Sequence, residues 1–111
     1  MPLKRPSQLE LQDVVHNGGH TLVLTGELDM SGAAHLEEAI LAAVADASGL
    51  TLDLSQLTFM DSTGLNVILF ARELCQDTAE FSLVPGPPQV QQIFEMTNLL
   101  DQLPFRAPEL N

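Results

Sequence analysis

The feature that most constrains how this chain can fold is the alternation of strand-like and helix-like segments along almost its whole length. Two stretches that alternate apolar and polar residues flank a turn signal, and helical and strand patterns then follow one another. Strands that alternate with helices pair in parallel through right-handed crossovers. The sequence therefore predicts a single α/β domain with a mixed, mostly parallel sheet, an N-terminal antiparallel edge hairpin and helices packed on the sheet.

The expected elements follow from periodicity and from breaker residues. The hairpin strands are residues 9–12 and 20–25, on either side of Asn17-Gly18-Gly19, because Asn and Gly tolerate the positive φ of a tight turn. Ser31 is the expected N-cap of the first helix, which should run to about Asp46. The later elements are a strand at 50–54, a loop at 55–60, a helix after Gly64 to about Cys75, a strand at 80–84, a helix from 89 to about 96 with Pro88 in its first turn, and a short element at 98–105 for which a helix is one interpretation.

Length, composition and charge narrow the class of protein. The 111 residues suit one domain over residues 1–111, with a core at about 7–105, and a hydrophobic content of 45% is that of a folded chain. The net charge is −11, and the only cations are Lys4, Arg5, Arg72 and Arg106. Nucleic acids and anionic membranes are bound by clustered cations. We therefore expect neither of these partners, and an acidic surface instead favours a basic protein partner.

The chain carries no pattern for membrane insertion or export. Its longest apolar run, 39–45, is far shorter than the about 20 residues of a membrane span. The first residues include two cations, but the apolar stretch of a secretory signal does not follow them. Cys75 is the single cysteine, which excludes an intramolecular disulfide and suggests a packing role. These features together predict a cytoplasmic protein.

The segment with the most chemical information is Phe59-Met60-Asp61-Ser62-Thr63-Gly64-Leu65, between an expected strand and an expected helix. α/β folds place their sites at this edge, and the first N–H groups of a helix carry partial positive charge. A phosphate on Ser62 would meet those donors and add about −1.5 to −2 charges next to Asp61, which would disrupt a docked partner. A simpler interpretation is that Asp61 or Ser62 only caps the helix. Phe59 and Met60 are expected in the core or at the rim of the site.

The same segment closely resembles the phosphorylation-site motif of anti-sigma factor antagonists, which belong to the STAS domain family. The resemblance extends over about residues 7–105 and includes the order of the elements. It also includes Gly26-Glu27-Leu28-Asp29 after the second strand, Val84-Pro85 at a strand end and Met96-Thr97-Asn98-Leu99 after a helix. By these motifs the chain is identified as a single STAS-like domain.

The resemblance implies a binding protein rather than an enzyme. An unphosphorylated antagonist binds an anti-sigma factor, a kinase of the histidine-kinase-like ATP-binding fold, and thereby releases a sigma factor. The kinase phosphorylates the first hydroxyl of the motif, here Ser62 rather than Thr63, and a metal-dependent Ser/Thr phosphatase reverses this. Asp61, Thr63 and Gly64 correspond to the docking site around Ser62, and Asp29 to a loop aspartate near it. We expect Asp29→Ala to weaken docking and to leave the thermal stability nearly unchanged.

Two chemical alternatives fit the sequence less well. A serine nucleophile elbow has the pattern G-x-S-x-G, but Met60 stands two residues before Ser62, and no histidine follows His35 to complete the order of a hydrolase triad. His16, His20 and His35 lack the ligand spacing of a metal site. A Gly-rich phosphate loop is also missing from the sequence. We therefore expect no catalytic residue, no bound metal and no nucleotide cofactor.

The main alternative within the same fold is a STAS subunit of a lipid-transport ABC system, which binds the ATPase of that system. The string from Met60 to Leu65 favours the sigma-regulatory class instead. A third possibility is a scaffold protein in a stress-signalling complex. Such scaffolds usually carry an additional amino-terminal domain, which we do not expect here.

Overall fold

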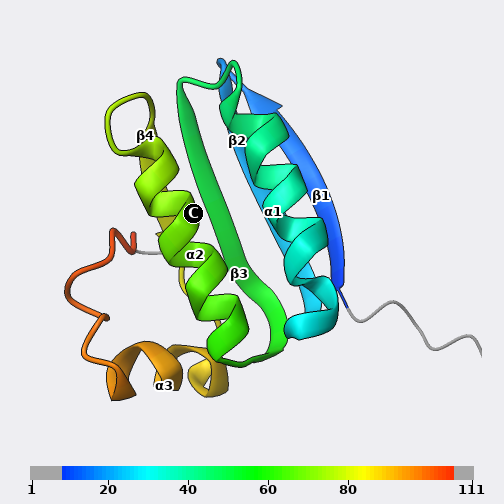
Figure 1. Cartoon of the computed structure of the whole chain (residues 1–111). Coiled ribbons are helices and arrows are strands. Elements are labelled where there is room, and N and C mark those ends of the chain that lie inside the picture. The colour runs from blue at the N-terminus through cyan, green and yellow to red at the C-terminus, as the bar shows by residue number, and fades with distance from the viewer. Residues whose placement is uncertain (1–8, 107–111) are drawn as a thin grey trace, which may run out of the picture.

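The computed structural model describes residues 9–106 and has a four-stranded mixed sheet at its centre (Figure 1). Two strands form the antiparallel hairpin, and two further strands extend the sheet in parallel, which confirms the predicted α/β fold class. The sequence of residues 1–8, which is interrupted by Pro2 and Pro6, predicts a short polar arm, and these residues lie outside the described part of the chain. The strands, in their order across the sheet, are β1 (Leu9–His16), β2 (Gly19–Leu28), β3 (Gly49–Met60) and β4 (Glu80–Val84).

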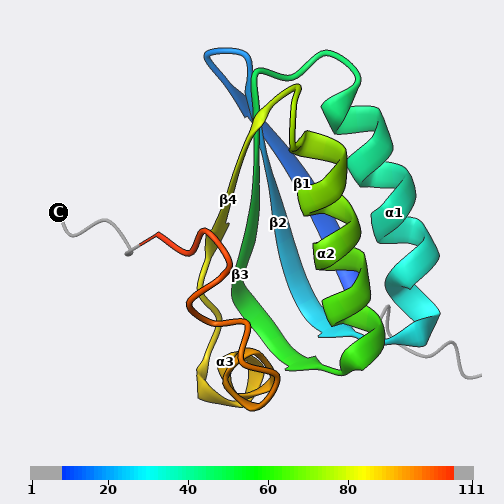
Figure 2. The same ribbon diagram turned by 60° about the vertical axis from the view of Figure 1, so that its left-hand side comes forward.

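Three helices complete the described part of the domain. α1 (Met30–Val44) and α2 (Ser62–Cys75) lie side by side on one face of the sheet, as Figures 1 and 2 both show. α3 (Pro88–Met96) lies at the end of the sheet where β3 leads into α2 (Figure 2). Within residues 9–106, no helix has both the length and the apolar character needed to cross a membrane.

The hydrophobic core lies between the sheet and the pair of helices. Leu22 and Leu52 are register partners on β2 and β3, and both are fully buried, because alternate side chains of a strand point to the same face. Leu36 and Ile40 of α1 and Ile68 of α2 are fully buried on the facing side. The apolar stripes predicted for these helices therefore cover the sheet.

β3 is longer than predicted, because the segment expected as a loop at 55–60 continues the strand to Met60. Its pairing with β2 shifts register twice, between Val23 and Thr25 and between Gly26 and Glu27. Such irregularities break the two-residue alternation of side chains that marks a strand in a sequence. With these added residues β3 ends level with β2, next to the starts of α1 and α2.

Both long helices begin differently from the prediction. α1 has Asp29 as its N-cap, not Ser31, and α2 begins at Ser62, not after Gly64, with Asp61 as its N-cap. An aspartate carboxylate accepts the N–H groups two and three residues ahead of it. The aspartate that directly follows each strand therefore caps the helix, and the helix starts one residue later.

Two further boundaries differ from the expectation. α1 ends at Val44, slightly earlier than predicted, and the segment 98–105 forms turns and a single bridge to β4 instead of a helix. The N–H of Leu83 donates to the carbonyl of Pro104 at 3.0 Å, and the N–H of Arg106 donates to the carbonyl of Leu83 at 2.9 Å. Unpaired groups on an edge strand attract such pairing. The last described residues therefore cover the edge of β4.

Candidate functional site

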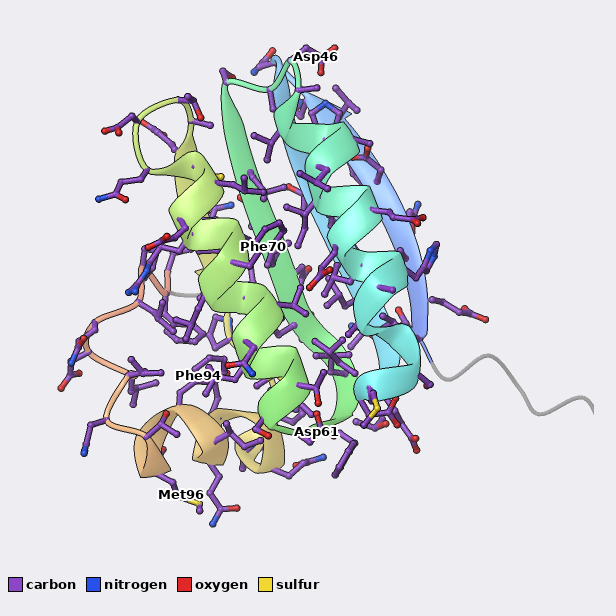
Figure 3. The ribbon with its side chains drawn as sticks, in the orientation of Figure 1. Asp46, Asp61, Phe70, Phe94 and Met96 are labelled. Atoms are coloured by element: carbon purple, nitrogen blue, oxygen red, sulfur yellow. The ribbon has the colours of Figure 1, made fainter. Side chains whose placement is uncertain are left out.

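The site lies at the carboxyl ends of β2 and β3, which are adjacent parallel strands. Leu28 and Met60 are register partners at these ends, and the N–H of Asp61 donates to the carbonyl of Leu28 at 3.3 Å. An aspartate and then a helix follow each strand directly. Figure 3 shows Asp61 at this end of the molecule, at the start of α2. Asp29 and Ser62, predicted to border one surface, therefore stand at the same edge of the sheet.

The two junctions share a four-residue pattern, Asp-X-Ser/Thr-Gly, which occurs as Asp29-Met30-Ser31-Gly32 and as Asp61-Ser62-Thr63-Gly64. In each, Oδ1 of the aspartate accepts the N–H two residues ahead, at 3.0 Å in the first junction and at 2.9 Å in the second. This short repeat was not predicted from the sequence. Its signal is an aspartate at a strand end with a glycine three residues later.

The glycine of each junction lets the helix start approach the sheet. Gly64 is buried, and a Cβ atom there would lie 2.7 Å from Cγ of both Leu28 and Met60. A Cβ atom on Gly32 would lie 2.9 Å from Cδ2 of Leu9. Contacts below 3 Å are shorter than any ordinary van der Waals contact. The missing side chain of Gly64 therefore allows the start of α2, which carries Ser62, to pack closely against the ends of the strands.

The second residue of each junction is exposed at the first position of its helix. These residues are Met30 in α1 and Ser62 in α2. Asp61 caps α2, so of the two capping residues considered from the sequence, Asp61 has that role and Ser62 does not. Thr63 is half-buried and supplies the capped N–H group. Of the two hydroxyl-bearing residues in the motif, Ser62 is thus the more exposed.

The surroundings of Ser62 are acidic. Asp29 and Asp61 are half-buried caps, and Glu27 is exposed one residue before the end of β2. The cations of the described residues lie elsewhere: Arg72 is in the last turn of α2, and Arg106 pairs with β4. No described cation therefore balances a negative charge placed on Ser62.

Large apolar side chains border the same edge. Met60 is 2% exposed and belongs to the core, whereas Phe59 is 46% exposed and stands at the rim. Met30 is 77% exposed, and the sequence analysis did not single it out. Nε2 of Gln89, at the start of α3, donates to the carbonyl of Thr58 at 3.3 Å. α3 is thereby attached to the end of β3 beside the site.

Other chemically capable side chains lie away from this edge. Nδ1 of His20 lies 2.9 Å from both carboxylate oxygens of Asp13, a pairing that the sequence analysis did not predict. Among residues 9–106, no three His, Cys, Asp or Glu side chains are grouped so that they could hold a metal ion. Cys75 is buried at the end of α2, and burial raises the pKa of its thiol. A protonated thiol is a poor nucleophile, in agreement with a packing role.

Comparison with known proteins identifies the family. The family model described as "Mlab, STAS domain" matches residues 13–104. The chain therefore belongs to the STAS domain family. RsfB of Mycobacterium tuberculosis, an anti-sigma-F factor antagonist, is 35% identical over 83 residues, which are 74% of this chain and 68% of RsfB.

Solved structures share the same fold. An anti-sigma factor antagonist from Mycobacterium paratuberculosis is 31% identical, with a TM-score of 0.84 over 97% of this chain and 92% of that chain. The unphosphorylated form of SpoIIAA, also an anti-sigma factor antagonist, is 23% identical, with a TM-score of 0.73 over 91% of this chain and 88% of that chain. The phosphorylated form of SpoIIAA, from Bacillus, is 22% identical, with a TM-score of 0.69 over 91% of each chain. The similarity to SpoIIAA concerns the fold alone.

Proposed function

We propose that this protein is an anti-sigma factor antagonist that is switched by phosphorylation of Ser62. The unphosphorylated form binds an anti-sigma factor kinase of the histidine-kinase-like ATP-binding fold, and the kinase then releases its sigma factor. Phosphorylation of Ser62 by the kinase ends the interaction, and a Ser/Thr phosphatase restores it. The observation that carries the proposal is the exposed hydroxyl of Ser62 at the first position of α2, where Asp61 already serves as the cap.

The hydrogen bonds at the start of α2 support a switch based on charge and hydration. Oδ1 of Asp61 accepts from the N–H of Thr63 at 2.9 Å and from that of Gly64 at 3.4 Å. The N–H groups of Thr63 and Gly64 therefore already have an acceptor in the unphosphorylated protein. A phosphate would add about −1.5 to −2 charges next to Asp61, and water would hydrate these charges at this exposed position. A docked partner removes that water, so phosphorylation should weaken docking.

The relatives support the same function. RsfB and the structure from Mycobacterium paratuberculosis are both named anti-sigma factor antagonists, at 35% and 31% identity. A regulator of this kind acts by binding, so we assign no catalytic residue to this chain.

The alternative of a STAS subunit that binds a transporter ATPase is not favoured. RsfB of Mycobacterium tuberculosis, a relative from Listeria monocytogenes and the structure from Mycobacterium paratuberculosis, at 31–35% identity, are all named as antagonists of anti-sigma factors. The same purified protein can be tested against a transporter ATPase of the source organism. Stable binding to that ATPase, together with no binding to any anti-sigma kinase, would support the alternative.

The direct test is incubation with each anti-sigma factor kinase of the source organism and ATP, followed by mass spectrometry of the phosphorylated residue. We expect one phosphate on Ser62 of the wild type and none on Ser62→Ala. Ser31→Ala is the matched control, because Ser31 lies in the equivalent junction, at the second position of α1, and this variant should be phosphorylated like the wild type. A phosphate on Thr63 with Ser62 unmodified would contradict the assignment.

A further inference from the structure

The two junctions differ at their exposed second residue, and this difference indicates how a partner is held. Met30 and Ser62 both occupy the first position of a helix, so an apolar side chain and a hydroxyl stand at one edge of the sheet. We infer that Met30 and Phe59 are apolar anchors that insert into a pocket on the anti-sigma factor kinase, with lysine or arginine side chains of the kinase around that pocket. This inference rests on the proposed function and assigns the contacts of that same site.

The position of these two side chains sets them apart from ordinary exposed apolar residues. Single apolar side chains are common on protein surfaces, so an exposure of 77% for Met30 and 46% for Phe59 decides nothing alone. Met30, however, directly follows the cap Asp29, and Phe59 is the register partner of Glu27 at the end of β2. Both therefore lie on adjacent segments at the edge that presents Ser62.

The residue types also fit an anchoring role. Aromatic residues and methionine are enriched in the central part of protein interfaces, where truncation of a buried anchor costs the most affinity. The flexible thioether of methionine adapts to an irregular pocket. Ser62 would then be enclosed with these side chains when the partner docks. A phosphate on Ser62 would enter a dehydrated, partly apolar contact, which is where an added charge is most disruptive.

Charge complementarity identifies the chemistry of the partner. Glu27, Asp29 and Asp61 stand at the same edge of the sheet as the two anchors, and the described cations Arg72 and Arg106 lie elsewhere. The whole chain has a net charge of −11. A partner with basic side chains around an apolar pocket matches both features and is attracted from a distance. A uniformly apolar or acidic partner surface does not match them.

The test is titration calorimetry with the anti-sigma factor kinase that phosphorylates the wild type. Phe59→Gln should raise the Kd at least tenfold and Met30→Gln at least threefold, whereas Phe59→Leu keeps an apolar anchor and should stay within threefold. Leu41→Gln is the matched control, since Leu41 is 51% exposed on the same helix as Met30 and lies about 16 Å further along it. This control should stay within twofold of the wild type. Raising the salt concentration from about 0.05 M to 0.5 M should weaken binding of the wild type and of Phe59→Leu alike, because screening acts on the acidic rim.

The outcomes separate this inference from the proposed function. One outcome is that Ser62 is phosphorylated and the wild type binds, but Phe59→Gln and Met30→Gln bind within twofold of it. In that case the assignment of the two anchors is wrong, and the proposed switch at Ser62 is retained. A loss in Leu41→Gln as large as that in Phe59→Gln would also overturn the anchors, and binding that does not respond to salt would overturn the basic rim. If no anti-sigma kinase binds or phosphorylates the wild type, the proposed function fails and the anchors fail with it. Thermal unfolding of each variant establishes that the compared proteins are folded.

Discussion

The junction between β2 and α1 and the junction between β3 and α2 have the same local architecture and different exposed chemistry. Each has an aspartate that caps the helix and a buried glycine that packs the helix start against apolar side chains. In the first junction, the hydroxyl of Ser31 donates to Oδ1 of Asp29 at 2.7 Å, and the exposed residue is Met30. In the second junction, the exposed residue is Ser62. The same backbone arrangement thus occurs twice, and its exposed second residue is apolar in the first junction and carries a hydroxyl in the second.

This comparison shows which parts of the motif hold the structure and which are available for regulation. The aspartate and the glycine have roles within the fold, because they satisfy helix N–H groups and permit close packing. The second residue contributes little to either, since it faces solvent in both junctions. A substitution or a modification there should therefore change recognition more than stability.

The largest expected effect is on binding at Ser62. Ser62→Asp should weaken binding of the anti-sigma kinase at least thirtyfold, or about 2 kcal/mol, because it adds a charge beside Asp61 that docking must dehydrate. Ser62→Asn has a similar size without the charge and should fall nearer to Ser62→Ala, which should stay bound in the presence of ATP. Titration calorimetry of the three variants measures this. Equal affinities for the Asp and Asn variants would replace the electrostatic account with a steric one.

The next effect compares the two buried glycines. Gly64→Ala should lower the free energy of unfolding by about 1–2 kcal/mol, because overpacking against Leu28 and Met60 outweighs the better helix propensity of alanine. Gly32→Ala should cost less, because its shortest contact is with Cδ2 of Leu9, the end of a flexible side chain. Urea denaturation measures both changes, provided that the m-value is the same for the wild type and the variants. A more stable Gly64→Ala protein would show that the site relaxes around the added methyl group.

A smaller effect is expected when either cap is removed. Asp29→Ala and Asp61→Ala should each lower the free energy of unfolding by about 1 kcal/mol, since each leaves helix N–H groups without their acceptor. For Asp29 this replaces the expectation from sequence that stability stays nearly unchanged. Asp→Asn variants keep an acceptor and should retain most of the stability. The affinity per folded molecule, measured in parallel, separates capping from docking, and unchanged unfolding in both alanine variants would refute the capping role.

The smallest effect on stability is expected at Cys75. This residue is buried at the C-terminal end of α2, whereas Ser62 is exposed at its start. Burial raises the pKa of the thiol above its ordinary value of 9.0, so the folded state favours the protonated form. The contribution of the thiol to the free energy of unfolding is therefore fully present below the ordinary pKa. It is lost as the pH rises from there through the raised pKa of the folded state. Wild-type protein should therefore lose slightly more stability than Cys75→Ala between about pH 8 and pH 10. If the free energy of unfolding changed equally with pH in the two proteins, the result would argue against burial of the thiol.

Several local features could be read from the sequence because neighbouring residues decide them. Glu80–Val84 forms the predicted strand, and Asn17 and Gly18 adopt the positive φ expected of a hairpin turn. The predicted stripe of α1 is buried at Leu36 and Ile40. The segment that contains Ser62 was also recognised, because the motif is contiguous. In each case a short stretch of chain contains the whole signal.

The sequence by itself determined the order of the elements, the α/β class and the motif around Ser62, because hydrophobic periodicity and turn residues act over a few neighbouring positions. The tertiary structure alone decided that residues 55–60 extend β3 and that residues 104–106 pair with β4. These features depend on pairing between residues far apart in the chain. Register shifts between β2 and β3 hide the strand periodicity, and only the parallel alignment of their ends brings Met30 to the edge that carries Ser62.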